Sequence, residues 1–438
     1  MPVSKNEPLS TLRATPLRVA VIADSDTRWK WGALTARRLS ADPAVPVELS
    51  GFLLRGRATP TARQLAEVGI GAVDVQELTG AAFLREVERK AYDVVVLALV
   101  GGAVQAMLHG LAGMGEPARR PVVVTGYVGV VYEKLADGLL LRHGADVVLA
   151  NSRHDADRFR AVYEGVGADA SAVTEAALPF LGGTPYEGES AKTVVFAAQP
   201  SVPESRADRT YLLRRLVEHA RLHPDREVLL KLRSQPGEHT THLEELPYQK
   251  LADAMDLPPN FRLVYGHMGD VLDRTDLLVT VSSTAALESL HRRIPTAVLT
   301  DLGVREPLGN HHFLGSGCLA SWAQLDAGER PQADEQWLAA QGVAADGSYE
   351  TAFDAVRKRV AHLLAEPQLP PLAPYYTPTT APGYLPGILA RYRLDAAPAP
   401  EATGLRRVVR EAMRNAARGA YRHGVQRVAP VIRRMGEL

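Results

Sequence analysis

Three small hydroxyl residues, Ser282, Ser283 and Thr284, lie between an apolar run and a helix-forming stretch. The run 276–281 predicts a buried strand, and the stretch after Thr284 predicts a helix. A helix start has free N–H groups and the positive end of the helix dipole, which together favour a phosphate. Glu288 follows about one turn later, where its carboxylate suits a ribose or sugar hydroxyl. Simple N-capping by these hydroxyls is the alternative.

Further polar residues and glycines follow predicted strands in the same half of the chain. A guanidinium such as that of Arg233 binds phosphate through two parallel hydrogen bonds, and glycines allow close approach of the backbone. The donor-side candidates in these loops are Gln199, Arg233, Glu238, Gly266, Met268, Gly315 and Ser316, and His242 is a candidate catalytic group. Surface loops and plain turns are the alternatives. Because ligands bind at the carboxyl ends of such strands, the set predicts a nucleotide-phosphate site.

The first half of the chain supplies a candidate catalytic base. Asp24 and Asp26 follow a predicted strand, where a carboxylate can take the proton of an acceptor hydroxyl. They alternate in an extended loop, so only one need face the second half. N-capping of the following helix is the alternative. The acceptor-side candidates are Lys30, Thr125, Gly126 and Tyr127, with the Tyr127 ring either stacking on a sugar or covering the core.

Alternating strands and helices position these residues. Near-continuous apolar strands predict parallel sheets covered on both faces, and the turn-rich stretch 181–190 separates two such units. We therefore predict an α/β fold of two doubly wound, Rossmann-like domains, 18–185 and 190–365, facing each other across a cleft. Residues 1–17 are predicted to form a disordered tail.

The composition excludes several classes of protein. The 438 residues carry equal numbers of acidic and basic side chains, 50 of each, so no global basic field indicates nucleic acid. The single cysteine, Cys318, excludes internal disulfides and a cysteine-based zinc site. No glycine fingerprint of dinucleotide-binding folds follows the first strand of either half, and the Walker A lysine loop and the nucleophile elbow are absent. Without a secretory signal or an apolar stretch of about 18 residues, a cytoplasmic location is expected.

The end of the chain differs from the rest. Residues 366–400 are rich in proline and are predicted to cross back over the domains, with a short helix over 384–392. Residues 401–438 hold nine arginines and three glutamates, a net charge of +6. Their spacing predicts a basic amphipathic helix, which either contacts anionic lipid at the inner face of the plasma membrane or packs on the protein.

At these residues the chain resembles GT-B glycosyltransferases. It is similar to an actinobacterial family of glycosyltransferases of unknown substrate and, more distantly, to bacterial polysialyltransferases and capsule transferases. The resemblance covers roughly 18–365 and rests on four stretches, 23–31, 125–127, 231–242 and 276–295. The wider group has a serine pair that holds the donor phosphate, which Ser282 and Ser283 match. The group's His-Pro pair is replaced here by 233–236, so Arg233 or His242 substitutes for the histidine, or the donor differs.

The resemblance implies a metal-independent transferase without a cofactor, acting on a nucleotide-sugar of the UDP or CMP type and a glycan or lipid-linked acceptor. The spacing of Asp276 and Ser283 is also similar to that of glycerophosphate transferases that build teichoic acids. The same architecture also fits a UDP-sugar 2-epimerase, which needs no acceptor, and a non-enzymatic sugar-nucleotide sensor.

Overall fold

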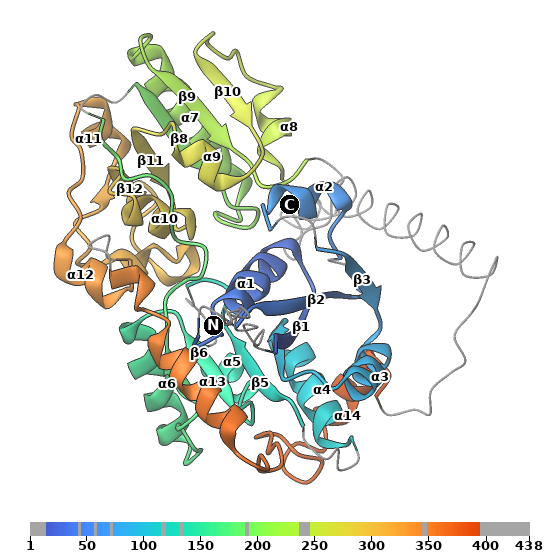
Figure 1. Ribbon diagram of the computed structural model, residues 1–438. Coiled ribbons are helices and arrows are strands. Elements are labelled where there is room, and N and C mark those ends of the chain that lie inside the picture. Colours follow the sequence, from blue (N-terminus) through green and yellow to red (C-terminus); the bar gives the residue numbers. More distant parts are fainter. Residues whose placement is uncertain are drawn as a thin grey trace, which may run out of the picture.

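The computed structural model describes residues 15–42, 45–56, 59–70, 73–114, 120–130, 135–188, 192–235, 246–343 and 348–394. These residues form two parallel β-sheets with helices on their faces (Figure 1). The predicted fold class, two Rossmann-like α/β domains, is confirmed. The predicted helix over 401–438 and most of the tail 1–17 lie outside the described residues.

The first sheet, within the described residues, has the strand order β3-β2-β1-β4-β5-β6-β7. Both of its faces are covered, so its central strands are continuous apolar runs, and all five residues of β4 are buried. The order reverses between β1 and β4, so the loops after these strands flank the point where such sheets bind ligands. Its strands are β1 (Leu17–Ala23), β2 (Val47–Leu54), β3 (Val75–Leu78), β4 (Val94–Ala98), β5 (Val122–Gly126), β6 (Val147–Ala150) and β7 (Val173–Glu175).

The second sheet follows the same plan with the order β10-β9-β8-β11-β12-β13. Its order reverses between β8 and β11, which places the loops after these two strands at the corresponding point. Its strands are β8 (Thr193–Ala197), β9 (Glu227–Lys231), β10 (Phe261–Val264), β11 (Leu277–Thr280), β12 (Thr296–Leu299) and β13 (Leu319–Ala320).

Hydroxyl side chains begin several helices of the first half. Ser25, Thr61, Thr79 and Ser152 each accept a backbone N–H three residues on, an interaction that typically contributes about 1 kcal/mol. The helices are α1 (Asp26–Arg37), α2 (Ala62–Glu67), α3 (Gly80–Lys90), α4 (Gly101–Ala112), α5 (Leu135–Leu140) and α6 (Arg153–Gly165).

The helices around the second sheet are shorter, apart from α7, which Ser205 caps. They are α7 (Arg206–Leu222), α8 (Tyr248–Ala252), α9 (Met268–Leu272), α10 (Ala285–His291), α11 (Trp322–Asp326) and α12 (Glu335–Ala340), with 3-10 turns η1 (Glu306–Leu308), η2 (Asn310–Phe313) and η3 (Ser348–Glu350). Among the described helices of the chain, none is long and apolar enough to cross a bilayer.

The chain returns to the first sheet after completing the second (Figure 1). Helix α13 (Asp354–Ala365) packs against β5, β6 and β7, although its sequence falls within the range 190–365 expected for the second domain. Helix α14 (Leu385–Tyr392) then packs on α4, which confirms the predicted short helix. Apolar residues of α10 and α13 join those of the first sheet in one core cluster. The two halves are therefore held together by a shared apolar core as well as by the connecting chain.

Candidate active site between the two sheets

Helix α1 carries two predicted site residues toward the second half of the chain. Asp26 is its first residue, and the Asp26 carboxylate accepts the N–H of Thr27 at 2.8 Å. The same carboxylate forms an ion pair with Arg233, which follows β9. The structure therefore brings a predicted catalytic residue together with a predicted donor-binding residue that lies 207 positions away.

A second ion pair joins the halves one turn further along α1. Lys30 Nζ lies 3.5 Å from Glu288 Oε2, and the two side chains are only 14% and 11% exposed. The ammonium also lies 4.8 Å from the centroid of the Phe180 ring. An ion pair thus joins α1 and α10. An anionic ligand that binds the Lys30 ammonium must therefore compete with the Glu288 carboxylate.

Asp24 binds within its own half. One carboxylate oxygen pairs with Arg28 Nη1 at 2.9 Å, and the other accepts the N–H of Val100, the residue before α4, at 3.0 Å. Asp24 therefore ties the loop after β1 to the start of α4. Of the two predicted alternates, Asp26 is the one that faces the second half.

The two serines of the predicted pair differ in how deeply they are buried. Ser282 is 1% exposed, and its hydroxyl donates to the Leu308 carbonyl at 2.5 Å. Gln199 holds the same residue, since its Oε1 accepts the Ser282 N–H at 3.0 Å and its Nε2 lies 3.2 Å from the Ser282 hydroxyl. Ser282 and Gln199 thus bind each other and the chain, and the phosphate and donor contacts predicted for them stay predictions.

Ser283 and Thr284 are only partly buried. The Ser283 hydroxyl accepts the Ala285 N–H at 3.3 Å, a local side chain–backbone bond just before the N-cap of α10, Thr284. The Thr284 side chain makes no capping bond. A Cβ at Gly129, in the loop after β5, would lie 2.9 Å from Thr284 Oγ1, so this loop of the first half directly abuts the hydroxyl segment.

The turn after β10 also approaches the first half. Gly266 has a positive φ of 97°, and Met268 begins α9 with a partly buried side chain that packs in the core beside the sheet. His267 lies between them, and a Cβ at Gly69 would be 3.6 Å from its Nε2. The predicted backbone turn therefore exists at the expected sheet edge.

The pair Gly315 and Ser316 lies elsewhere. Ser316 is fully buried, its hydroxyl accepts the Cys318 N–H at 3.0 Å, and its carbonyl accepts the N–H of Asp334, the N-cap of α12. Gly315 is exposed, with a positive φ of 78°. The buried Ser316 thus holds the approach to β13 and α12, and the donor-side role predicted for it stays a prediction.

Three of the acceptor-side residues, at the end of β5 and directly after it, make structural contacts. Thr125 is fully buried and donates its hydroxyl to the Leu97 carbonyl at 3.0 Å. A Cβ at Gly126 would lie 2.9 Å from the Trp31 ring. The Tyr127 ring lies 4.0 Å from the Arg142 guanidinium, and burial raises the pKa of Tyr127. The acceptor roles predicted for these residues stay predictions, and for Tyr127 the contacts favour the alternative that the ring covers the core.

A family model described as "Putative glycosyltransferase (DUF6716)" matches residues 19–363. The chain belongs to this family. No curated protein sequence matches it significantly. Its fold is similar to that of UDP-GlcNAc 2-epimerase from Neisseria meningitidis bound to UDP-GlcNAc, at 11% identity and a TM-score of 0.51, over 80% of this chain and 100% of that one. UDP-GlcNAc 2-epimerase from Methanocaldococcus jannaschii (10% identity, TM-score 0.47, 80% and 100% covered) and spinosyn rhamnosyltransferase SpnG (14%, 0.41, 80% and 97%) also match.

This member of the glycosyltransferase family also has a buried lysine near the candidate site, Lys231, to which the sequence analysis gave no role. Lys231 ends β9 and is 5% exposed. Burial lowers its pKa to about 8. A lysine that ends a strand directly after three apolar residues, at a predicted ligand edge, was the feature of the sequence from which a role could have been predicted.

One group of side chains has the ligand types of a metal site. His219, His223 and Asp326 bring their ligand atoms within 4.8 Å of one another at the end of α7. His219 Nδ1 lies 2.6 Å from Asp326, however, and its Nε2 lies 3.3 Å from Arg226. Arg215 also binds Asp326, at 2.7 Å. Two guanidinium groups on the same cluster oppose a divalent cation, and the spacing is that of a hydrogen-bonded network.

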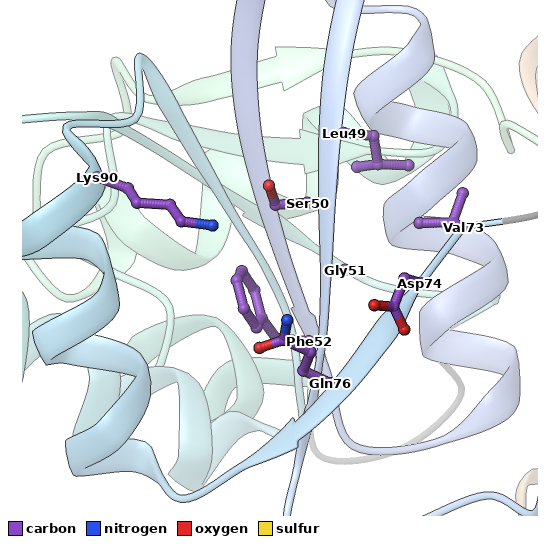
Figure 2. A pocket seen from close by; sticks show the side chains of 8 residues that line it. All are labelled: Leu49, Ser50, Gly51, Phe52, Val73, Asp74, Gln76 and Lys90. Carbon is purple, nitrogen blue, oxygen red and sulfur yellow. The ribbon is translucent and has the colours of Figure 1, made fainter.

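A cavity of about 310 Å³ lies at the edge of the first sheet, between β2 and β3 (Figure 2). Ser50, Asp74 and Gln76 line it together with Lys90, whose ammonium pairs with Glu86 at 3.0 Å. The lining comes from the middle of β2, from β3 and the residues before it, and from the end of α3, whereas ligands of such sheets bind at the carboxyl ends of the strands. The cavity is therefore separate from the candidate site.

Two further predicted site residues, Glu238 and His242, lie outside the described residues. Their predicted roles stay predictions.

Proposed function

We propose that the chain transfers a sugar from a nucleotide-activated donor to a glycan or lipid-linked acceptor without a metal ion. Membership of the glycosyltransferase family supports the reaction class. The observation that carries the proposal is the ion pair of Asp26 and Arg233, because a guanidinium recognises carboxylate and phosphate by the same paired geometry. The carboxylate thus lies where a donor phosphate would bind, and it is released when the phosphate arrives.

In the proposed reaction the donor phosphate replaces Asp26 on Arg233. The freed carboxylate takes the proton of an acceptor hydroxyl as that oxygen attacks the anomeric carbon. The bond between this carbon and the phosphate oxygen breaks, and the nucleotide leaves with the electron pair. Arg233 stabilises the charge that develops on the phosphate. Glu288, held by Lys30, accepts a hydrogen bond from a ribose or sugar hydroxyl.

Nucleotide binding tests the donor part of this proposal. Thermal unfolding is measured with UDP, CMP, CDP, GDP and dTDP. We expect at least one to raise the midpoint, and Arg233→Met to remove the shift. Arg262→Met is the matched control, because Arg262 lies on the edge strand β10 with a side chain 68% exposed. Indifference of the native protein to all five nucleotides would overturn the proposal.

Turnover tests the role of Asp26. Asp26→Asn is expected to lower kcat by about 10²-fold or more, the usual contribution of a general base, while nucleotide binding is retained. Asp24→Asn changes a carboxylate that binds only within the first half, so a smaller loss is expected. A sugar-nucleotide sensor would bind nucleotide without turnover in either form.

Epimerisation is the second candidate, because the Neisseria meningitidis epimerase shares the fold. An epimerase needs no acceptor. Incubation with the donor alone, followed by product analysis, separates the two reactions: formation of an epimer would replace the transferase proposal. A product in which the donor's phosphate is transferred with its organic group would instead indicate a glycerophosphate transferase.

We also propose that residues 401–438 bring the enzyme to a lipid-linked acceptor by contacting anionic lipid. The net charge of +6 supports electrostatic attraction of about 1 kcal/mol per basic residue near the surface. Cosedimentation with anionic liposomes is compared for the full chain and a chain ending at residue 400. Equal binding by both would contradict this role.

A further inference from the structure

The ammonium of Lys231 is buried at the carboxyl end of β9 with most of its hydrogen-bonding capacity unused. The residue is 5% exposed, and Nζ donates to the Leu232 carbonyl at 2.7 Å. A lysine ammonium has three donors. Among the residues that the structure describes, no carboxylate forms an ion pair with Lys231. A buried charge without a partner is unfavourable, so its presence at a ligand edge calls for an anion.

The charged groups around Lys231 already form ion pairs that do not include Lys231. Glu67 and Arg63 of α2 act on it from the first half and form an ion pair together. Arg233 and Glu288 act on it from the second half, and they pair with residues of α1. Lys231 therefore adds a positive charge that the described protein groups do not neutralise.

Lys231 is the last residue of β9, and Arg233 follows two residues later in the bend after the strand. The Arg233 guanidinium lies close enough to act electrostatically on the Lys231 ammonium. A sugar linked to a nucleoside diphosphate has two phosphate charges, whereas one linked to a nucleoside monophosphate has one. A phosphate that displaces Asp26 satisfies Arg233, and a second phosphate is needed to satisfy Lys231.

We propose that the Lys231 ammonium contacts a phosphate oxygen of the donor, and that Lys231 and Arg233 together select a nucleoside diphosphate sugar over a monophosphate sugar. This inference rests on the proposed function. The competing explanation is structural, in which Lys231 serves only to hold the Leu232 carbonyl. The two explanations predict opposite effects on stability: loss of a ligand-binding charge relieves the fold, while loss of a structural bond weakens it.

Lys231→Met tests this inference against a matched control. Lys192→Met removes an exposed lysine just before β8, at the opposite, amino-terminal edge of the same sheet. Calorimetry gives the Kd of each variant for the diphosphate and the monophosphate of the nucleoside that binds best, and for inorganic pyrophosphate. We expect Lys231→Met to weaken the diphosphate and pyrophosphate by about tenfold or more, and the monophosphate by about threefold or less. The thermal midpoint is expected to stay or rise.

Proton linkage supplies a second readout. Burial lowers the pKa of Lys231 to about 8, and a bound phosphate favours the charged form. At pH 8.5, titrations in two buffers of different ionisation enthalpy are expected to show proton uptake on diphosphate binding by the native protein and by Lys192→Met. Lys231→Met is expected to show less uptake.

The outcomes separate this inference from the proposed function. Native protein that binds diphosphate, with Lys231→Met binding it equally well, overturns the inference and leaves the proposed function standing. A lower midpoint with equal losses for monophosphate and diphosphate makes Lys231 structural, which also overturns it. Native protein that binds no nucleotide and no pyrophosphate overturns both.

Discussion

At the scale of single residues, the adjacent Ser282 and Ser283 differ in burial and in their hydrogen-bond partners. Ser282 is sealed between Gln199 and the Leu308 carbonyl, whereas Ser283 is partly exposed at the start of α10. Removing a buried hydroxyl leaves its partners unsatisfied, which costs about 1–3 kcal/mol. We therefore expect ligand contact at this segment to come from Ser283 and Thr284.

We expect Ser282→Ala to lower the free energy of unfolding by about 1–3 kcal/mol, and Ser283→Ala to lower it by less than about 1 kcal/mol. Urea unfolding measures both. Ser283→Ala is expected to weaken nucleotide binding at unchanged stability. The reverse ranking of the two variants in stability would show that the burial of the pair is misassigned.

The buried amine of Lys231 predicts a dependence of stability on pH. Its pKa is about 8 in the folded protein and 10.5 by its ordinary value, so between these values the unfolded chain binds more protons. The free energy of unfolding then rises with pH across this window by up to about 3 kcal/mol, and below pH 8 the contribution is constant. Urea unfolding at pH 7 and 10 is compared with Lys231→Met. We expect the free energy of unfolding to rise more with pH in the native protein than in the variant. Equal rises in the two proteins would contradict the lowered pKa of Lys231.

At the scale of elements, the packing of α1 on the first sheet depends on a glycine, Gly126, which has no side chain. A Cβ at Gly126 would lie 2.9 Å from both the Leu149 carbonyl oxygen and the Trp31 ring. A backbone oxygen cannot move without disturbing β6, so the residue at the end of β5 is set by packing. A glycine predicted to bind an acceptor therefore has a packing role in the core.

Gly126→Ala is expected to lower the free energy of unfolding by about 1–3 kcal/mol through overpacking. Gly383→Ala is the control, since a Cβ at Gly383 meets nothing within 4 Å. Differential scanning calorimetry measures both. A stable Gly126→Ala variant with impaired acceptor binding alone would restore the acceptor role predicted from the sequence.

At the scale of the whole molecule, the two sheets are not independent units. Helix α13 follows the second sheet and packs on the first, burying Val356 and Val360 almost completely. The ion pairs from α1 to Arg233 and Glu288 join the same halves. The site between the sheets therefore depends on elements distant in sequence.

A chain that ends at residue 350 is expected to lose at least about 5 kcal/mol of stability, because α13 buries three aliphatic side chains worth about 1.5–3 kcal/mol each. A chain that ends at residue 394 keeps α13 and α14, and we expect it to unfold in a single transition within about 1 kcal/mol of the full chain. Calorimetry compares the three chains. Unimpaired stability of the shorter chain would show that the first sheet does not need α13.

The sequence by itself determined the strands that are long and apolar, because burial on both faces leaves a local pattern. It therefore indicated both sheets and the loops at their carboxyl ends. The short edge strands β3, β7 and β13 were not predicted, since each holds at most two apolar residues and so leaves no comparable pattern.

Only the tertiary structure decided which loop residues are available to a ligand. Asp24 and Asp26 are alike in sequence, but Val100 holds one and Arg233 the other. Ser282 is sealed by a carbonyl 26 residues away. The physical reason is that a polar side chain is available only when no distant group has already satisfied it, and those partners are set by the packing of the whole chain.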